Sequence, residues 1–206
     1  MKIQPYKTLK SYNESELKER KSVFLAKAYP VNNEDGVSTI LDELKKEYYD
    51  ASHRCYAYRL LSEKLKFSDA GEPSGTAGIR ILNAIDHYEL HDCLVVVIRY
   101  FGGTRLGIGP LGKAYYLAAV QVLSESTIIT KKPYLQAEIK IAISSFDKLS
   151  RVLASNQIKV LETIFNSEIR LKCLIPFEIL EKIRVKLTEI LKGEVDIIIN
   201  DEILFK

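Results

Sequence analysis

The sequence predicts an α+β fold with two domains, an N-terminal domain over residues 1–130 and a C-terminal domain over residues 134–206. The two halves differ in composition, because eight of the ten glycines fall between Gly71 and Gly112 while residues 134–206 contain only Gly193. Helical and alternating patterns also mix without a regular βαβ repeat, which favours α+β over α/β. The composition therefore indicates two differently built units.

The boundary between the halves is expected at TKKPYLQ, residues 130–136. Two lysines and a proline follow a long helical pattern there and precede a fresh alternating run, which is typical of a linker near residues 125–134. With 206 residues, of which 47% are apolar, the chain can bury a sizeable core.

Charge, cysteine content and the lack of long apolar runs limit the class of protein. They give no sign of a strongly basic nucleic-acid binder, a disulfide-rich protein or a membrane protein. A net charge of +3 is too small to mark a nucleic-acid binder by itself, so any anion-binding surface must come from local clustering of cations. The three cysteines are far apart in apolar runs, which indicates buried free thiols. The N-terminus lacks the apolar stretch of a secretory signal, and no run approaches the roughly 18 residues of a membrane span. We expect a cytoplasmic protein that does not associate with membranes.

In the N-terminal half, the patterns predict strands that surround a central one. The run DCLVVVIRYF, residues 92–101, is apolar enough to be buried on both faces of a sheet. Other strands are expected at residues 21–31, 52–60 and 65–68, and helices at residues 36–50, at 76–90 and from about Pro110.

The C-terminal half has the order βαββαβ. Strands are expected at residues 135–143, 158–165, 168–175 and 194–200, and helices at 145–156 and 176–193. Ser145 is a candidate N-cap, and Asn166 with Ser167 forms the turn of a hairpin. This order predicts a four-stranded antiparallel sheet with two helices on one face, the ferredoxin-like arrangement.

The stretch GIGPLGKA, residues 107–114, matches two nucleotide-binding patterns at once. A P-loop needs a hydroxyl where Ala114 stands, and Pro110 removes a backbone N–H donor. A dinucleotide fingerprint would follow its strand directly, whereas RYFGGTRL intervenes. We interpret the stretch as a helix start, with Gly109 at the cap and Pro110 in the first helical position. An anion could bind there, because cations lie nearby in sequence.

A second glycine-rich turn, SDAGEPSGTAG at residues 68–78, carries two acids, Asp69 and Glu72. Ser74 or Thr76 is a candidate cap for the following helix. The acids either pair with Arg99 or Arg105, or act as metal ligands or a general base. For His53, in the neighbouring strand, a structural hydrogen bond and a catalytic role are the two alternatives.

Together these segments resemble the Impact/YigZ family. The resemblance covers about residues 17–124 and is carried by DAGEPSGTAG, by VVVIRYFGGTRLG and by a GKAY stretch, with KSVFLAKAYPV and ASHRCYAYRL upstream. The chain departs from the family where Ala70 replaces a second acid, where Ile79 and Arg80 replace a basic residue and proline, and at Pro110 and Gly112.

The resemblance implies a fold more than an activity. It implies an N-terminal domain similar to domain four of elongation factor G, of the type seen in the second domain of ribosomal protein S-five and in small-molecule kinases. It also implies a C-terminal ferredoxin-like domain similar to domain five of the same factor. The eukaryotic Impact protein tunes translation by restraining a stress kinase, through a partner bound by a domain that this chain lacks.

Two hypotheses for function follow. The first is a non-catalytic module that binds RNA or the ribosome and modulates translation, with a protein of the translation machinery as a further partner, and without metal or cofactor. Its binding residues are expected to be Ser74, Gly75, Thr76, Arg99, Tyr100, Phe101, Gly102, Gly103, Arg105, Gly107 and Lys113. The alternative is an enzyme acting on a small phosphorylated or nucleotide substrate through His53, Asp69 or Glu72.

Overall fold

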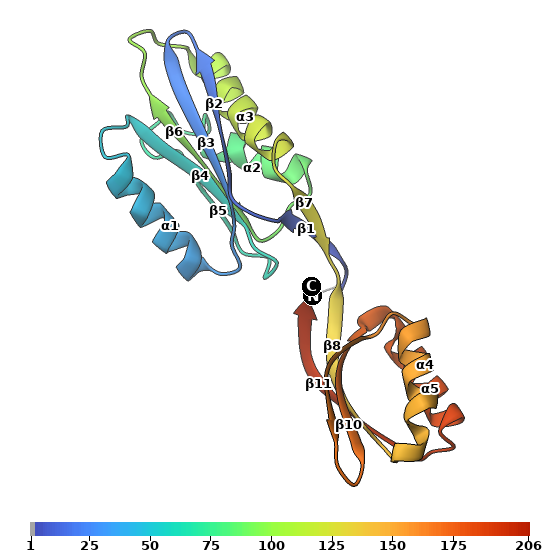
Figure 1. Cartoon of the computed structure of the whole chain (residues 1–206). Coiled ribbons are helices and arrows are strands. Elements are labelled where there is room, and N and C mark those ends of the chain that lie inside the picture. Colours follow the sequence, from blue (N-terminus) through green and yellow to red (C-terminus); the bar gives the residue numbers. More distant parts are fainter. Residues whose placement is uncertain (1–2) are drawn as a thin grey trace. The chain divides into compact units, whose positions relative to one another are not determined.

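The computed structural model describes residues 3–206 and mixes helices with mainly antiparallel sheets, in agreement with the predicted α+β class (Figure 1). The chain forms two compact units, Tyr6–Thr130 and residues 131–206 with residues 3–5. None of the helices within residues 3–206 combines the length and the apolar character that crossing a membrane requires.

The first unit is built on a five-stranded sheet in the order β2-β3-β6-β4-β5. The strands are β2 (Asn13–Glu19), β3 (Ser22–Pro30), β6 (Cys93–Tyr100), β4 (His53–Arg59) and β5 (Leu65–Ser68). Every neighbouring pair is antiparallel. Strand β6 is central, as predicted, because its first seven residues are all buried and can pack on both faces of the sheet.

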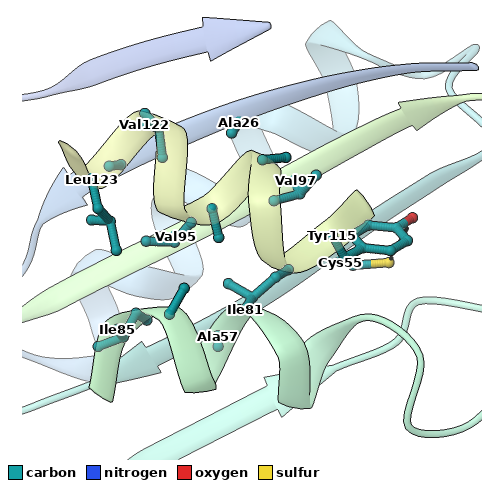
Figure 2. Packing of buried hydrophobic residues seen from close by; sticks show 14 of the residues in the cluster. Ala26, Cys55, Ala57, Ile81, Ile85, Val95, Val97, Tyr115, Val122 and Leu123 are labelled. Carbon is teal, nitrogen blue, oxygen red and sulfur yellow. Dashed lines mark hydrogen bonds between the residues drawn. The ribbon is translucent and has the colours of Figure 1, made fainter. Parts of the chain in front are cut away.

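Helices cover both faces of this sheet (Figure 1). Helix α1 (Glu34–Glu47) packs on one face, whereas α2 (Gly78–His87) and α3 (Ile108–Ser124) pack on the other. Within β6, Val95 and Val97 belong to the core under α2 and α3, and the alternate residues belong to the core under α1. Figure 2 shows Val95 and Val97 facing α2 and α3, with Tyr115 and Cys55 at one end of this core.

Several parts of the first unit differ from the sequence-based expectation. Strands β1 (Tyr6–Leu9) and β7 (Ile128–Lys131) form a separate two-stranded sheet, and neither was predicted. Strand β2, at one edge of the five-stranded sheet, was not predicted either. Residues 125–134 were predicted as a linker, but they contain β7 and the beginning of β8 (Pro133–Ile141). The boundary between the two compact units nevertheless falls inside this segment, between Thr130 and Lys131. The segment is not irregular, because its apolar and β-branched residues enter strands.

The second unit has the predicted order βαββαβ. After β8 come η1 (Ile143–Ser145), α4 (Phe146–Ser155), β9 (Lys159–Phe165), β10 (Ile169–Pro176), η2 (Phe177–Ile179), α5 (Leu180–Ile190) and β11 (Val195–Phe205). The sheet is antiparallel in the order β11-β8-β10-β9, and both helices contribute to its one buried core. Ser145 precedes α4, but its side chain makes no capping hydrogen bond.

Candidate anion-binding site around the glycine-rich loops

The glycine-rich loop at residues 68–78 ends at α2, and Asp69, which lies before the helix, caps its first N–H groups. Its Oδ1 accepts hydrogen bonds from the backbone N–H of Ala77 at 2.9 Å and of Gly78 at 2.8 Å, and its Oδ2 accepts one from Gly75 at 2.9 Å. Partial burial acts to raise the pKa of Asp69, but these three donors hold it below its ordinary value. Both carboxylate oxygens of Asp69 are therefore occupied.

The cap that the sequence predicted for α2 is thus corrected. Neither Ser74 nor Thr76 caps the helix, whose N-cap position is Ala77 and has no side-chain bond. Ser74 is exposed, whereas Thr76 is buried and donates its hydroxyl to the carbonyl of Pro73 at 2.6 Å. A capping aspartate eight residues upstream has no simple signature in sequence.

Glu72 and Arg99 form a buried ion pair between this loop and β6. Arg99 Nη1 donates to Glu72 Oε1 at 2.6 Å, and the two side chains are only 6% and 4% exposed. The hydroxyl of Tyr115 donates to the same oxygen at 2.8 Å, and Arg99 Nη2 donates to Ser22 Oγ at 3.3 Å. Glu72 therefore pairs as one of the two sequence interpretations expected, whereas Asp69 makes no such pair.

Sequence reasoning missed Tyr115 as a member of this cluster. It lies on α3 and is fully buried, and its ring packs edge-on against Phe24 at 5.1 Å between centroids. Burial raises the pKa of Tyr115 far above its ordinary value, so its hydroxyl stays a hydrogen-bond donor. A tyrosine in an apolar helical pattern gives no signal of its distant carboxylate partner.

His53 lies beside the ion pair without closing a hydrogen bond to it. Its Nδ1 is 3.0 Å from the carbonyl oxygen of Ala70, and a carbonyl can only accept, so Nδ1 carries a proton. The other nitrogen, Nε2, is 3.7 Å from Glu72 Oε2. The imidazole is thereby oriented with Nε2 towards a carboxylate oxygen that Arg99 and Tyr115 leave free.

Two glycines of the motifs are required by close packing of backbones. A Cβ on Gly78 would lie 2.7 Å from the backbone nitrogen of Ser68, and one on Gly102 would lie 2.0 Å from the carbonyl carbon of Lys21. Both distances are shorter than any van der Waals contact. Gly78 thus allows a close approach of two backbones, and Gly102, expected to bind a ligand, has the same structural role.

Helix α3 begins two residues earlier than the sequence suggested. Its N-cap is Gly107, with φ of 84°, and Gly109 and Pro110 lie inside the first turn, so the predicted cap at Gly109 is wrong. This turn has no acidic residue and no side-chain cap. Ala114, where a P-loop would need its hydroxyl, is buried in the core.

Exposed cations surround the start of α3. Arg105, Lys113 and Arg80 are exposed, and within residues 3–206 none of them makes an ion pair. Phe101 is 49% exposed, whereas Tyr100 is partly buried and donates its hydroxyl to Asp50 at 2.9 Å. Of these two aromatic residues, both named as binding residues from the sequence, only Phe101 is exposed.

The first turn of α3 separates two hollows. The first, of about 260 Å³, is lined by Glu72, Pro73, Arg99, Phe101, Arg105, Leu106, Gly107, Ile108 and Leu111. The second, of about 360 Å³, is lined by Arg80, Asn83, Gly109, Gly112, Lys113 and Tyr116. Cations contribute to the walls of both.

The predicted binding residues thus divide into two groups. Ser74, Phe101, Gly103, Arg105, Gly107 and Lys113 are exposed, and Gly75, Thr76, Arg99, Tyr100 and Gly102 are buried or partly buried. Members of the second group hold the loops together through the hydrogen bonds and close contacts described above.

Residues 20–123, which include both glycine-rich loops, match the family model described as the Impact N-terminal domain. The chain belongs to the Impact family. It is 28% identical to the Impact family member YvyE of Bacillus subtilis, over 95% of this chain and 91% of that protein. It is 26% identical to the family member YigZ of Escherichia coli, over 89% and 92% of the two chains, and 31% identical to a family member of Haemophilus influenzae, over 71% and 73%.

Relatives that share only part of the chain include Protein IMPACT of Xenopus laevis. It is 35% identical over 44% of this chain and 31% of the frog protein. A solved structure described as "Crystal structure of an hypothetical protein" superposes with a TM-score of 0.66, covers 97% of this Impact family chain and all of that chain, and is 23% identical. The fold is therefore one already seen in a solved structure.

Proposed function

We propose that this Impact family protein is a non-catalytic RNA-binding module that acts on the translation machinery. The observation that supports it is the group of exposed cations around the first turn of α3, Arg80, Arg105 and Lys113, which have no ion-pair partner within residues 3–206. Unpaired arginine and lysine side chains beside an exposed aromatic ring suit a single strand, through its phosphates and its bases.

The proposal includes the resemblance of the two units to domains four and five of elongation factor G. It takes these units as two domains, with residues 134–206 as a separate module, and it puts the protein in the cytoplasm, where ribosomes translate. A protein of the translation machinery is a further partner under the same proposal.

Under this proposal Arg105 and Lys113 contact the phosphates, and Arg99 does not. The charge of Arg99 is neutralised by Glu72 at 2.6 Å, and its side chain is buried. A buried, paired arginine has little attraction left for a distant phosphate, whereas an exposed unpaired cation releases counterions on binding. Arg99 instead supports the loop that carries Phe101 and Arg105.

Co-sedimentation with ribosomes of the host at low and moderate salt tests the proposal. The test variant is Arg105→Ala/Lys113→Ala, and the matched control is Lys45→Ala/Lys46→Ala, which removes two exposed lysines from α1 on the opposite face of the sheet. We expect salt-sensitive binding that is lost in the test variant and kept in the control. Absence of co-sedimentation at both salts, or equal loss in both variants, overturns the proposal.

A second candidate function is an enzyme acting on a small phosphorylated or nucleotide substrate. The observation that favours it is the 3.7 Å separation between His53 Nε2 and Glu72 Oε2, since Nε2 can accept a proton from a substrate hydroxyl placed beside it. Asp69 is not included among the catalytic residues of this enzyme, because both of its carboxylate oxygens accept backbone hydrogen bonds. Turnover of a phosphorylated metabolite that is abolished by His53→Gln supports an enzyme, and inactivity across a broad panel counts against it.

A further inference from the structure

We propose that the hollow of about 360 Å³ lined by α2 and α3 binds a phosphate monoester, the 5′-phosphate that ends an RNA strand. This inference rests on the proposed RNA-binding function and names which part of the RNA the hollow recognises. Ligand pockets measure roughly 300–1,000 Å³. A hollow at the lower end of that range suits a phosphate group with its sugar rather than a large cofactor.

The hollow is lined by one side of each helix. Arg80 and Asn83 are three residues apart on α2, and the lining residues of α3 recur three, four and seven positions after Gly109. Residues with this spacing lie on the same side of a helix. The full set is Arg80, Asn83, Gly109, Gly112, Lys113 and Tyr116. Side chains from two helices that share one core therefore converge on one space.

Two glycines of α3 leave room in this hollow. A Cβ on Gly109 would meet no atom within 4 Å, so this position has open space beside it. A Cβ on Gly112 would lie 3.3 Å from Arg80 Nε, so the guanidinium group lies against Gly112. Since Lys113 is the next residue, both cations border the same stretch of α3.

The hollow is lined by two positive charges, and none of the described residues that line it is acidic. Arg80 and Lys113 are exposed and make no ion pair within residues 3–206. Asp86, an acid further along α2, is paired with Arg59 Nη2 at 2.7 Å. The two cations are therefore available to an anionic ligand.

This charge selects among phosphates. A phosphate monoester carries a charge of about −1.5 to −2 at pH 7 and three acceptor oxygens, whereas each internal phosphate of a strand carries one charge. Two cations in one hollow match the monoester better, and Asn83 and Tyr116 can donate further hydrogen bonds to its oxygens. A terminal phosphate has chain on one side only. The strand can therefore leave across the first turn of α3, towards the hollow lined by Phe101 and Arg105.

The test is fluorescence anisotropy of the full chain with octamers of uridine that are labelled at the 3′ end and differ only at the 5′ end. One octamer ends in a hydroxyl, one in a phosphate, and one in a methyl phosphate, which keeps the phosphate but has a single charge. We expect the octamer with the terminal phosphate to bind about fivefold more tightly than the other two, since each of two exposed ion pairs contributes a factor of about two.

Substitutions in the hollow should remove this preference. Arg80→Ala should reduce it to about twofold. Gly109→Asp should abolish it, because a carboxylate is added where the hollow has space for a side chain. An acid in the first turn of a helix is favourable, so this variant should fold, and Gly109→Ala is the neutral control that should keep the preference. Arg105→Ala, in the other hollow, should weaken all three octamers alike.

The outcomes distinguish this inference from the proposed function. Equal affinity for the three octamers overturns the monoester site, and so does a preference that survives Gly109→Asp. If Arg105→Ala/Lys113→Ala still weakens binding in that case, RNA binding itself stands. Free uridine 5′-monophosphate that competes as well as the phosphorylated octamer would assign the hollow to a small phosphate monoester and overturn the RNA end. If no octamer binds and ribosomes do not co-sediment, both proposals fall.

Discussion

Asp69→Ala should destabilise the first unit substantially without touching any exposed cation. The variant leaves the backbone N–H groups of Gly75, Ala77 and Gly78 without their acceptor at the start of α2. Loss of a cap costs about 0.5–2 kcal/mol and an unpaired buried donor about 1–3 kcal/mol, so we expect the free energy of unfolding to fall by about 3 kcal/mol. Ala77 and Gly78 are buried, which leaves water little access to compensate.

Urea denaturation followed by circular dichroism measures this loss. Asp42→Ala, at an exposed position of α1, is the matched control and should change stability by no more than about 0.5 kcal/mol. An Asp69→Ala variant as stable as this control would refute the capping role. It would also return Asp69 to the set of candidate catalytic residues.

The pH dependence of Asp69→Asn provides a second check on the same reasoning. The pKa of Asp69 is lowered in the folded state, so its charge stabilises the protein above the pKa of the unfolded state. That contribution is lost as pH falls through the lowered folded pKa. The difference in stability between the wild type and Asp69→Asn should therefore be full at neutral pH and shrink below about pH 4. A difference that grows on acidification would show that the sign is wrong.

Three further predictions follow from the same loops. Gly102→Ala should prevent native packing or lower the melting temperature by many degrees, because its Cβ would lie 2.0 Å from the Lys21 backbone, whereas Gly109→Ala meets no atom within 4 Å and should be tolerated. Arg99→Met should cost about 3–5 kcal/mol in urea denaturation by leaving Glu72 buried and unpaired, and Arg105→Ala should cost less than about 0.5 kcal/mol. Burial raises the pKa of Cys55 to about 12, so a chromogenic thiol reagent at pH 8 should react far more slowly with this thiol in the native than in the urea-unfolded protein.

Much of the fold could be predicted from periodicity, because the elements with large apolar faces are the ones that tertiary packing retains. The central position of β6 followed from its continuous apolar run, and the antiparallel sheet of the second unit followed from its order of elements. The short strands β1 and β7 were missed, because four residues carry too little pattern to outweigh neighbouring lysines and prolines. Their pairing depends on contacts across more than 100 residues of sequence. Strand β2 was also missed, because its sequence NESELKE has almost no apolar residues to mark a buried face.

The candidate site was less predictable, since its pairings join residues far apart in the chain. The sequence placed Glu72, Arg99 and His53 in one cluster of hypotheses, and the structure brings them together. The sequence could not show that Arg99 is buried or that Tyr115 donates a hydrogen bond to Glu72. Nor could it show that the carboxylate of Asp69 accepts hydrogen bonds from backbone N–H groups. Residue type alone does not reveal whether a charge faces solvent or a partner.

The segments DAGEPSGTAG, residues 69–78, and RYFGG, residues 99–103, form one structure. Some of their side chains hold that structure together, and others face solvent. Asp69 caps α2, Glu72 and Arg99 form the buried ion pair, and Gly78 and Gly102 permit close backbone contacts. These roles give each of the five residues a structural reason to be in the motifs. Three exposed side chains take no part in these contacts. Phe101 and Arg105 line one hollow at the start of α3, and Lys113 lines the other. Substitutions in the first group should therefore change stability before binding, and substitutions in the second group should change binding while stability is kept, which is the separation that an RNA-binding surface on a rigid support requires.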